Sequence, residues 1–288
     1  SAPPTDADAL RIAAEAAERA GDLVGAIRAW AQVANRKEDP EVEAHLADLR
    51  VEGADARRRW VPPTQLEAPD PFPDVIGAPP EITADRLDAP TLAGALQHHG
   101  CLLVRGFAPA PFARSLAETV ERAFAQRAAA TPEAPATGPW YRPNAAWDRR
   151  SPQSAEAQRK WAEDLASMQL VDSPRALRRV TNLLMANGAV RTISEYFGEK
   201  PYLSTHKTTL RLVPPDPDVS WHQDGAFLGE DVALDVVPAR AAVFDRPIGH
   251  RPAAGVQDRL PSQADRRIDE DAGGAASGAR EEIGRAHV

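Results

Sequence analysis

The stretch VSWHQDGAFLG, residues 219–229, decides how we interpret this sequence. Side chains two positions apart in an extended strand point to the same face, so a strand here would bring His222 and Asp224 together. An imidazole and a carboxylate are two of the three ligands of a facial iron site, and Gly225 leaves room for a small bound molecule. The H-x-D pattern is common by chance, so its meaning depends on the surrounding sequence.

Composition excludes several classes of protein. The 288 residues hold 34 Lys and Arg against 42 Asp and Glu, a net charge of −8, which argues against a nucleic-acid or membrane-binding surface. The single cysteine, Cys101, excludes an internal disulfide and a cysteine-ligated metal cluster within one chain. No apolar run approaches the roughly 18 residues of a membrane span. We therefore expect a cytoplasmic globular protein.

The N-terminal part of the chain predicts packed amphipathic helices. Across residues 6–50, Ala and larger apolar residues recur at three- and four-residue spacing on both sides of a break at Gly21. With small residues at this turn and with Ala26 and Trp30 after it, residues 1–58 resemble a tetratricopeptide repeat. Little more than one repeat is present, whereas a solenoid usually needs about three. An unrelated helical hairpin is the alternative, and either form could bind a protein partner.

Proline then marks a predicted domain boundary. Residues 59–80 are proline-rich, and proline fixes φ and removes a backbone donor, so this segment predicts a linker. The second unit, residues 81–235, opens with a helix signal over residues 81–100. The apolar run CLLVRGF, residues 101–107, predicts a buried strand in which Cys101 is a small core residue.

The rest of this unit alternates helix and strand signals. Helices are predicted for residues 111–130 and, with a break at Gly188, for residues 173–201. Residues 202–214 alternate and are rich in β-branched residues, which favours a strand. The segment 140–147 carries two Trp and one Tyr, and we consider two interpretations of it, a lid over a site or an ordinary packed loop.

Three motifs together resemble a known family. The run HHGCLLVRGF, then THKTTLR, then WHQDGAFLG resembles the phytanoyl-CoA dioxygenase family of Fe(II)- and 2-oxoglutarate-dependent oxygenases over roughly residues 75–232. The resemblance implies an α+β fold, a double-stranded β-helix (jelly roll) with flanking helices. It implies that His222 and Asp224 bind Fe(II), and that 2-oxoglutarate and O₂ are co-substrates in hydroxylating a small organic substrate, with succinate and CO₂ as co-products. Halogenating relatives lack the carboxylate, so Asp224 favours hydroxylation.

The strand before the motif offers further candidates. Lys207, Thr209 and Arg211 share one face by the period of two. If that face lines the barrel, they could contact 2-oxoglutarate or a substrate carboxylate, whereas a solvated face is the ordinary alternative. His206 is a poor third iron ligand, because it precedes the motif and the family's distal histidine follows it.

The resemblance stops before the family's later strands, its distal histidine and its 2-oxoglutarate-binding arginine. Residues 236–288 contain few large apolar residues and cannot supply several strands, so His250 and His287 are poor third ligands. The final IGRAHV is one translation of the sequencing-adapter string ATCGGAAGAGCACACGTC, so we expect an out-of-frame or adapter-derived tail on a gene fragment. The alternative to the oxygenase is therefore an inactive fragment that acts, if at all, as a tetratricopeptide-like binding protein.

Overall fold

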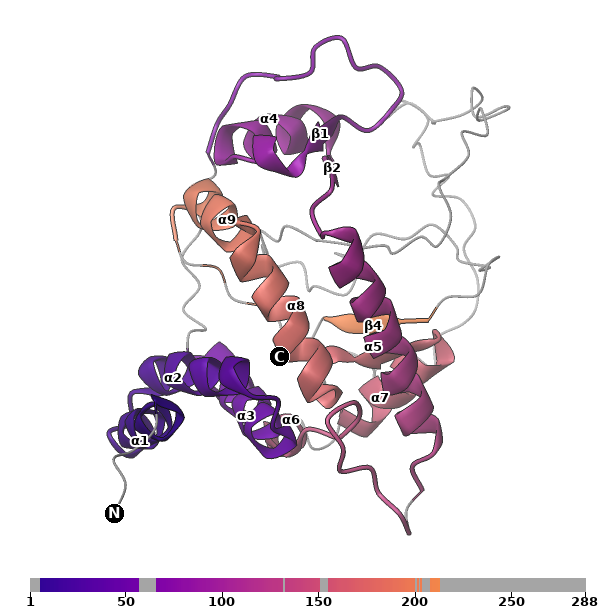
Figure 1. Cartoon of the computed structure of the whole chain (residues 1–288). Helices are drawn as coiled ribbons and strands as arrows, with labels where there is room; N and C mark the ends of the chain where they lie inside the picture. The colour runs from indigo at the N-terminus through magenta and orange to yellow at the C-terminus, as the bar shows by residue number, and fades with distance from the viewer. Residues whose placement is uncertain are drawn as a thin grey trace, which may run out of the picture. The chain divides into compact units, whose positions relative to one another are not determined.

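The computed structural model is helix-rich with short strands, which agrees with the α+β class in its general sense (Figure 1). None of the helices that it describes is long and apolar enough to cross a membrane. The structure describes residues 6–56, 66–131, 133–150, 155–199, 201, 203 and 208–212.

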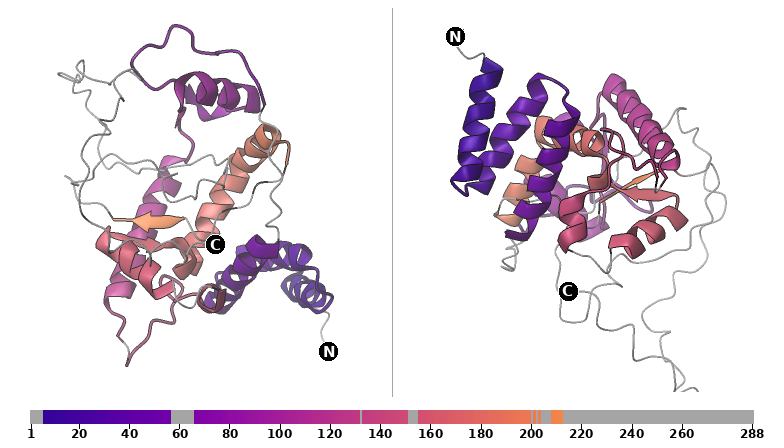
Figure 2. Two further views of the ribbon diagram at one scale, coloured as in Figure 1. Left: turned by 180° about the vertical axis from the view of Figure 1, so that it is seen from behind. Right: turned by 90° about the horizontal axis from the view of Figure 1, so that it is seen from below.

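The helices predicted for the N-terminal part of the chain are confirmed, and the structure has three of them. They are α1 (Asp6–Arg19), α2 (Leu23–Arg36) and α3 (Pro40–Ala56), and they lie side by side in Figures 1 and 2. Gly21 takes a φ of 72°, a left-handed conformation that costs glycine little, and so turns the chain between the first two helices. Their shared apolar cluster consists of Ala14, Ala26, Trp30, Ala34, Val42, Leu46 and Leu49.

A glutamate ties these helices together at the edge of their apolar cluster. Glu18 of α1 accepts a hydrogen bond from Nε1 of Trp30 at 2.7 Å, and its Oε2 lies 3.0 Å from Nε2 of His45 on α3. Partial burial opposes ionisation of Glu18, but the hydrogen bonds from His45 and Trp30 outweigh it and hold its pKa below the ordinary value. The ionised carboxylate therefore stabilises the three-helix arrangement.

The segment after the N-terminal helices forms a small parallel β–α–β unit. Strand β1 (Glu81–Thr83) pairs in parallel with β2 (Leu103–Arg105), and α4 (Ala89–His99) connects them. Asp88 caps α4 by accepting from the backbone N–H of Thr91, and Gly100 ends the helix in the left-handed conformation. The described part of the proline-rich segment is irregular, as predicted, and its Leu66 N–H donates to the carbonyl of Tyr196.

Two predictions for this segment are wrong. The predicted helix over residues 81–100 begins only at Ala89, because a strand and a short 3₁₀ turn come first. The run at residues 101–107 does form a strand, but Leu103 is 38% exposed and Cys101 is also exposed. An apolar run indicates burial only where other elements cover both faces of its sheet, and β2 belongs to a two-stranded pair in the described part of the chain.

The remaining helices follow the predicted order with two additions. The predicted helices correspond to α5 (Ala110–Ala128), α8 (Pro174–Ala186) and α9 (Ala189–Phe197), and the last two are separated at Gly188 as expected. The sequence did not predict α6 (Ala145–Arg150) or α7 (Ala155–Asp164). Helices α3, α5 and α8 share an apolar core with strands β3 (Ser167–Gln169) and β4 (Thr209–Arg211) and the turn after β3. Its buried residues are Ala47, Ala123, Met168, Leu170, Ala176, Leu177 and Leu210.

The aromatic segment at residues 140–147 is packed. Trp147 is fully buried and belongs to an apolar cluster with Val51 and Val171, while Trp140 and Tyr141 are half-buried. The backbone N–H groups of Trp140 and Tyr141 both donate to Oε1 of Gln126 on α5. Of the two interpretations, the packed loop therefore describes this segment.

Candidate functional site

The predicted iron ligands His222 and Asp224, and Lys207 with them, lie outside the described residues. Their roles stay predictions. Within the ranges that the structure describes, no group of three or more His, Cys, Asp and Glu side chains could hold a metal ion.

Thr209 and Arg211 lie on the short strand β4 (Thr209–Arg211), and the structure gives that strand a partner (Figure 2). β4 runs antiparallel to β3 (Ser167–Gln169), with Met168 opposite Leu210 and Gln169 opposite Thr209. Met168 and Leu210 both belong to the apolar core. Because side chains alternate along a strand, Thr209 and Arg211 share the other face, as the sequence predicted.

The register places Gln169 opposite Thr209 and Ser167 opposite Arg211, so these four side chains form one polar face of the strand pair. The backbone bonds from Leu170 N–H to Thr208 and from Leu212 N–H to Ala166 mark the hydrogen-bonded pairs of the ladder. Hydrogen-bonded and non-hydrogen-bonded pairs alternate along an antiparallel ladder. Gln169 and Thr209, next to the hydrogen-bonded pair of Leu170 and Thr208, are therefore a non-hydrogen-bonded pair, the type in which facing side chains lie closest.

The four side chains of this face differ in burial and in bonding. Gln169 is 2% exposed, Thr209 is half-buried and Arg211 is exposed. Ser167 is buried, and its hydroxyl donates to the carbonyl of Ala162 on α7 at 2.7 Å. Oε1 of Gln169 is buried and has no hydrogen-bond partner in the part of the chain that is described. No local pattern marks Gln169 in the sequence, because a three-residue strand is too short to show a period.

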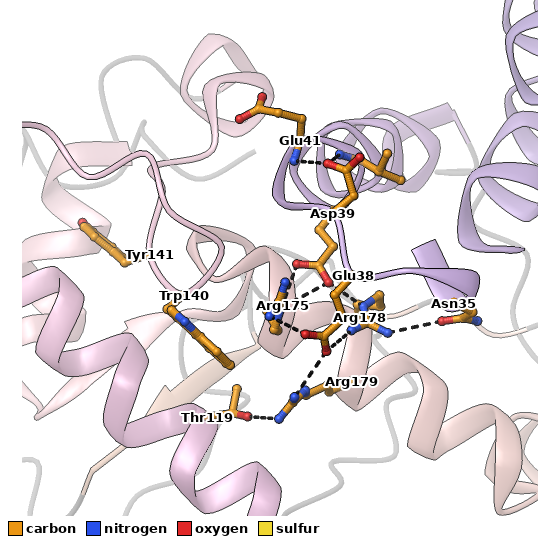
Figure 3. A network of polar contacts seen from close by, with 12 residues as sticks. Asn35, Glu38, Asp39, Glu41, Thr119, Trp140, Tyr141, Arg175, Arg178 and Arg179 are labelled. Carbon is orange, nitrogen blue, oxygen red and sulfur yellow. Dashed lines mark hydrogen bonds and ion pairs between the residues drawn. The ribbon is translucent and has the colours of Figure 1, made fainter. Parts of the chain in front are cut away.

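A cluster of charged side chains lies elsewhere in the described part of the chain, between α8 and the start of α3 (Figure 3). The carboxylate of Glu43 is fully buried. Nε of Arg175 donates to its two oxygens at 3.2 and 2.9 Å, and Nε of Arg178 donates to Oε1 at 2.8 Å. The side chains of Arg175 and Arg178 are each 10% exposed.

A second carboxylate completes the cluster. Glu38 accepts from Arg175 at 2.6 Å, from Arg178 at 2.9 Å and from Arg179 at 3.4 Å. Burial opposes its ionisation, but the three guanidinium groups outweigh burial and hold the pKa of Glu38 below the ordinary value. The guanidinium carbons of Arg175 and Arg179 also lie 5.0 and 5.5 Å from the ring centroid of Trp140.

These contacts give the cluster a structural role. Each carboxylate is bound by at least two guanidinium groups, so neither Glu38 nor Glu43 is placed to take a proton from a ligand. The cluster instead holds α3 against α8. Arg50 of α3 lies near it, and burial together with the charge of Arg178 lowers the pKa of Arg50 to about 10.

A second buried ion pair anchors the aromatic segment. Asp172 is 1% exposed, and Arg159 of α7 donates to its two oxygens at 2.7 and 2.9 Å. The same carboxylate accepts from the backbone N–H of Asn144 at 2.8 Å. Burial raises the pKa of Asp172, while Arg159 and the Asn144 N–H oppose that rise. Every oxygen of Asp172 has a partner, so this pair too fixes the fold.

The comparisons with known proteins assign no family to the chain. No family model, no curated protein and no solved structure matches it. The resemblance described above therefore rests on its three sequence motifs.

Proposed function

We propose that the protein is an Fe(II)- and 2-oxoglutarate-dependent oxygenase that hydroxylates a small organic substrate. The observation that carries the proposal is the motif WHQDG, in which His222 and Asp224 are two residues apart and Gly225 follows. On a strand this spacing directs an imidazole and a carboxylate to one point, and these are donors that a facial Fe(II) site uses. The double-stranded β-helix that the resemblance implies is part of the same proposal.

The chain's own residues supply the ligands and the walls of the site. His222 and Asp224 would hold the metal, and the third ligand is not assigned. Bound iron with 2-oxoglutarate and O₂ would supply the oxidising chemistry, which yields succinate and CO₂ with the hydroxylated product. Lys207, Thr209 and Arg211 would contact a carboxylate of the co-substrate or substrate, since cationic and hydroxyl donors form strong hydrogen bonds to carboxylates.

Metal binding and succinate release test the proposal together. Purified protein is titrated with Fe(II) without oxygen, and succinate is then measured after adding 2-oxoglutarate and air. We expect both signals in the wild-type protein, and neither in His222→Ala or Asp224→Ala. Gln223→Ala is the matched control, because residue 223 would point to the opposite face of the strand and should keep both signals.

Two outcomes would favour other functions. Metal binding through His222 without succinate would indicate another metal enzyme on a similar barrel, such as a cupin-like isomerase. A folded protein that neither binds Fe(II) nor releases succinate would contradict the proposal for this chain. It would favour a non-catalytic protein that binds a protein partner through its helical N-terminal segment.

A further inference from the structure

A short extended segment before β1, residues 66–72, lies against α4 (Figure 1). We call it the strap. Its even-numbered residues are half-buried, whereas its odd-numbered residues are exposed. This alternation is typical of an extended chain with one face on another surface. Leu66 and Ala68 of that face pack against the apolar cluster that α4 shares with Tyr196 of α9.

Helix α4 binds the strap largely through the strap's main chain. Nε2 of Gln97 donates to the carbonyl of Leu66 at 2.7 Å, and Oε1 of Gln97 accepts from the Ala68 N–H at 3.2 Å. Nε2 of His98 lies 3.2 Å from the carbonyl oxygen of Ala68. Contacts of this kind recognise an extended backbone more than particular side chains, as peptide-binding domains do.

Gly94 of α4 lets the strap approach the helix closely. A Cβ atom at this position would lie 2.4 Å from the carbonyl oxygen of Pro69 and 2.6 Å from Cδ of Pro71. Real Cβ atoms essentially never come so close to other atoms, so any other residue at position 94 would displace the strap. Glycine within a helix costs stability, and the contact with the strap is what it permits here.

Two side chains of the strap add specificity. Oδ1 of Asp70 lies 2.9 Å from Nε2 of His99, and the ring of Phe72 stands edge-on to the His99 ring with 6.1 Å between centroids. The Phe72 N–H, and after it His99, hold the pKa of Asp70 below its ordinary value, so the carboxylate is ionised at neutral pH. The contacts therefore select an acidic residue with an aromatic residue two positions later.

We propose that α4 carries a docking surface for an extended segment of a partner protein with the order Ala-Pro-acid-Pro-aromatic, and that the strap occupies this surface in cis. The hydrogen bonds to Gln97 and His98 are exposed, and such contacts open at a lower free-energy cost than a buried core. The strap is an autoinhibitory contact, because a short tether gives it an effective concentration of about a millimolar.

Peptide binding tests the proposal. A fluorescent peptide of residues 65–74, QLEAPDPFPD, is titrated into the full chain, and its anisotropy is measured. Substituting both Asp70→Ala and Phe72→Ala loosens the strap, because one charge-assisted hydrogen bond and one ring contact are lost. We expect this loosened variant to bind the peptide about 10- to 100-fold more tightly than wild type. Asp74→Ala, which removes an exposed carboxylate beyond the strap, is the matched control and should bind as wild type does.

A further substitution locates the bound peptide. Gly94→Ala, added to the loosened variant, places a Cβ atom where the peptide backbone would lie. Alanine favours a helix more than glycine does, so α4 should stay folded and circular dichroism should not change. We expect this substitution to weaken peptide binding at least about 10-fold, and a peptide that carries Asp70→Lys to bind about 10-fold more weakly than the original.

Three outcomes would overturn the proposal. The first is a folded loosened variant that does not bind the peptide, and the second is binding that Gly94→Ala leaves unchanged. The third is a concentration-dependent dimer of wild type that Gly94→Ala removes, which would assign the surface to the strap of a second copy. If the double substitution prevents folding, Asp70→Ala alone gives the same comparison, with an expected gain of about tenfold. None of these measurements involves iron or 2-oxoglutarate, so they are independent of the proposed function.

Discussion

Removing the buried carboxylate of Glu43 tests whether the charged cluster holds α3 to α8. Glu43→Gln keeps the shape of the side chain but removes the charge that neutralises Arg175 and Arg178. Its amide oxygen can still accept from both arginines, as Oε1 does in the carboxylate, but an NH₂ group replaces Oε2, which accepts from Arg175 at 2.9 Å. The variant therefore leaves two largely buried guanidinium groups without their nearest anion.

The expected cost follows from the burial of this pair. Breaking a buried ion pair by removing one partner costs about 3–5 kcal/mol. Glu38 still binds Arg175 and Arg178 at 2.6 and 2.9 Å, so we expect the low end, a loss of about 3 kcal/mol in the free energy of unfolding. For a domain of this size that loss corresponds to a fall in Tm of about 6–12 °C.

Urea denaturation, followed by tryptophan fluorescence and far-ultraviolet circular dichroism, measures the loss. Glu41→Gln is the matched control, because the Glu41 side chain is 73% exposed in its pair with Arg142 and such surface pairs contribute less than about 1 kcal/mol. If Glu43→Gln unfolds within about 1 kcal/mol of wild type, the cluster does not hold the two helices together and our reasoning is wrong.

Three further predictions concern single side chains. Arg50→Met should raise the free energy of unfolding at pH 7 by about 1–3 kcal/mol in urea, because it removes a charge that burial and Arg178 disfavour; a loss of stability would instead indicate a carboxylate partner. The hydrogen bonds that lower the pKa of Glu18 stabilise the fold above its unfolded pKa, near 4.5, and this contribution is lost as pH falls through the lower folded pKa. The stability difference between wild type and Glu18→Gln should therefore be full at pH 7 and disappear in acid, and a difference that grows in acid would contradict it. Ser173→Ala should leave the thermal midpoint unchanged or raise it slightly, since its buried hydroxyl has no partner in the described ranges and does not cap α8; a loss above about 1 kcal/mol would reveal a missed hydrogen bond.

Local sequence patterns predicted the long helices well. Apolar residues at three- and four-residue spacing predicted α1, α2 and α5, and Gly188 predicted the break between α8 and α9. The helix α7 was missed, because its sequence AEAQRKWAED is mostly polar and its one large apolar side chain, Trp161, is half exposed. Without an apolar stripe, only tertiary contacts select the helix.

Long-range pairing explains what the sequence could not predict about the sites. The period of two placed Thr209 and Arg211 on one face, but nothing near Gln169 indicates that it stands opposite Thr209, 40 residues later (209 − 169 = 40). The ion pairs of Glu43 were equally hidden, because a charged residue in an amphipathic helix ordinarily indicates a solvated face. In both cases the decisive partner comes from a distant segment of the chain.

The Glu43 cluster joins side chains that are synthesised at different times. Glu43 precedes its partner Arg175 by 132 residues, and ribosomes add about 5–20 residues per second. The carboxylate is therefore made roughly 7–26 s before Arg175 exists. During that interval α1, α2 and α3 can pack with one another, while Glu43 stays hydrated until α8 leaves the ribosome. A nascent chain halted before α8 would carry a folded helical segment in which the surface that binds α8 is still exposed to water. Chaperones could recognise such a surface.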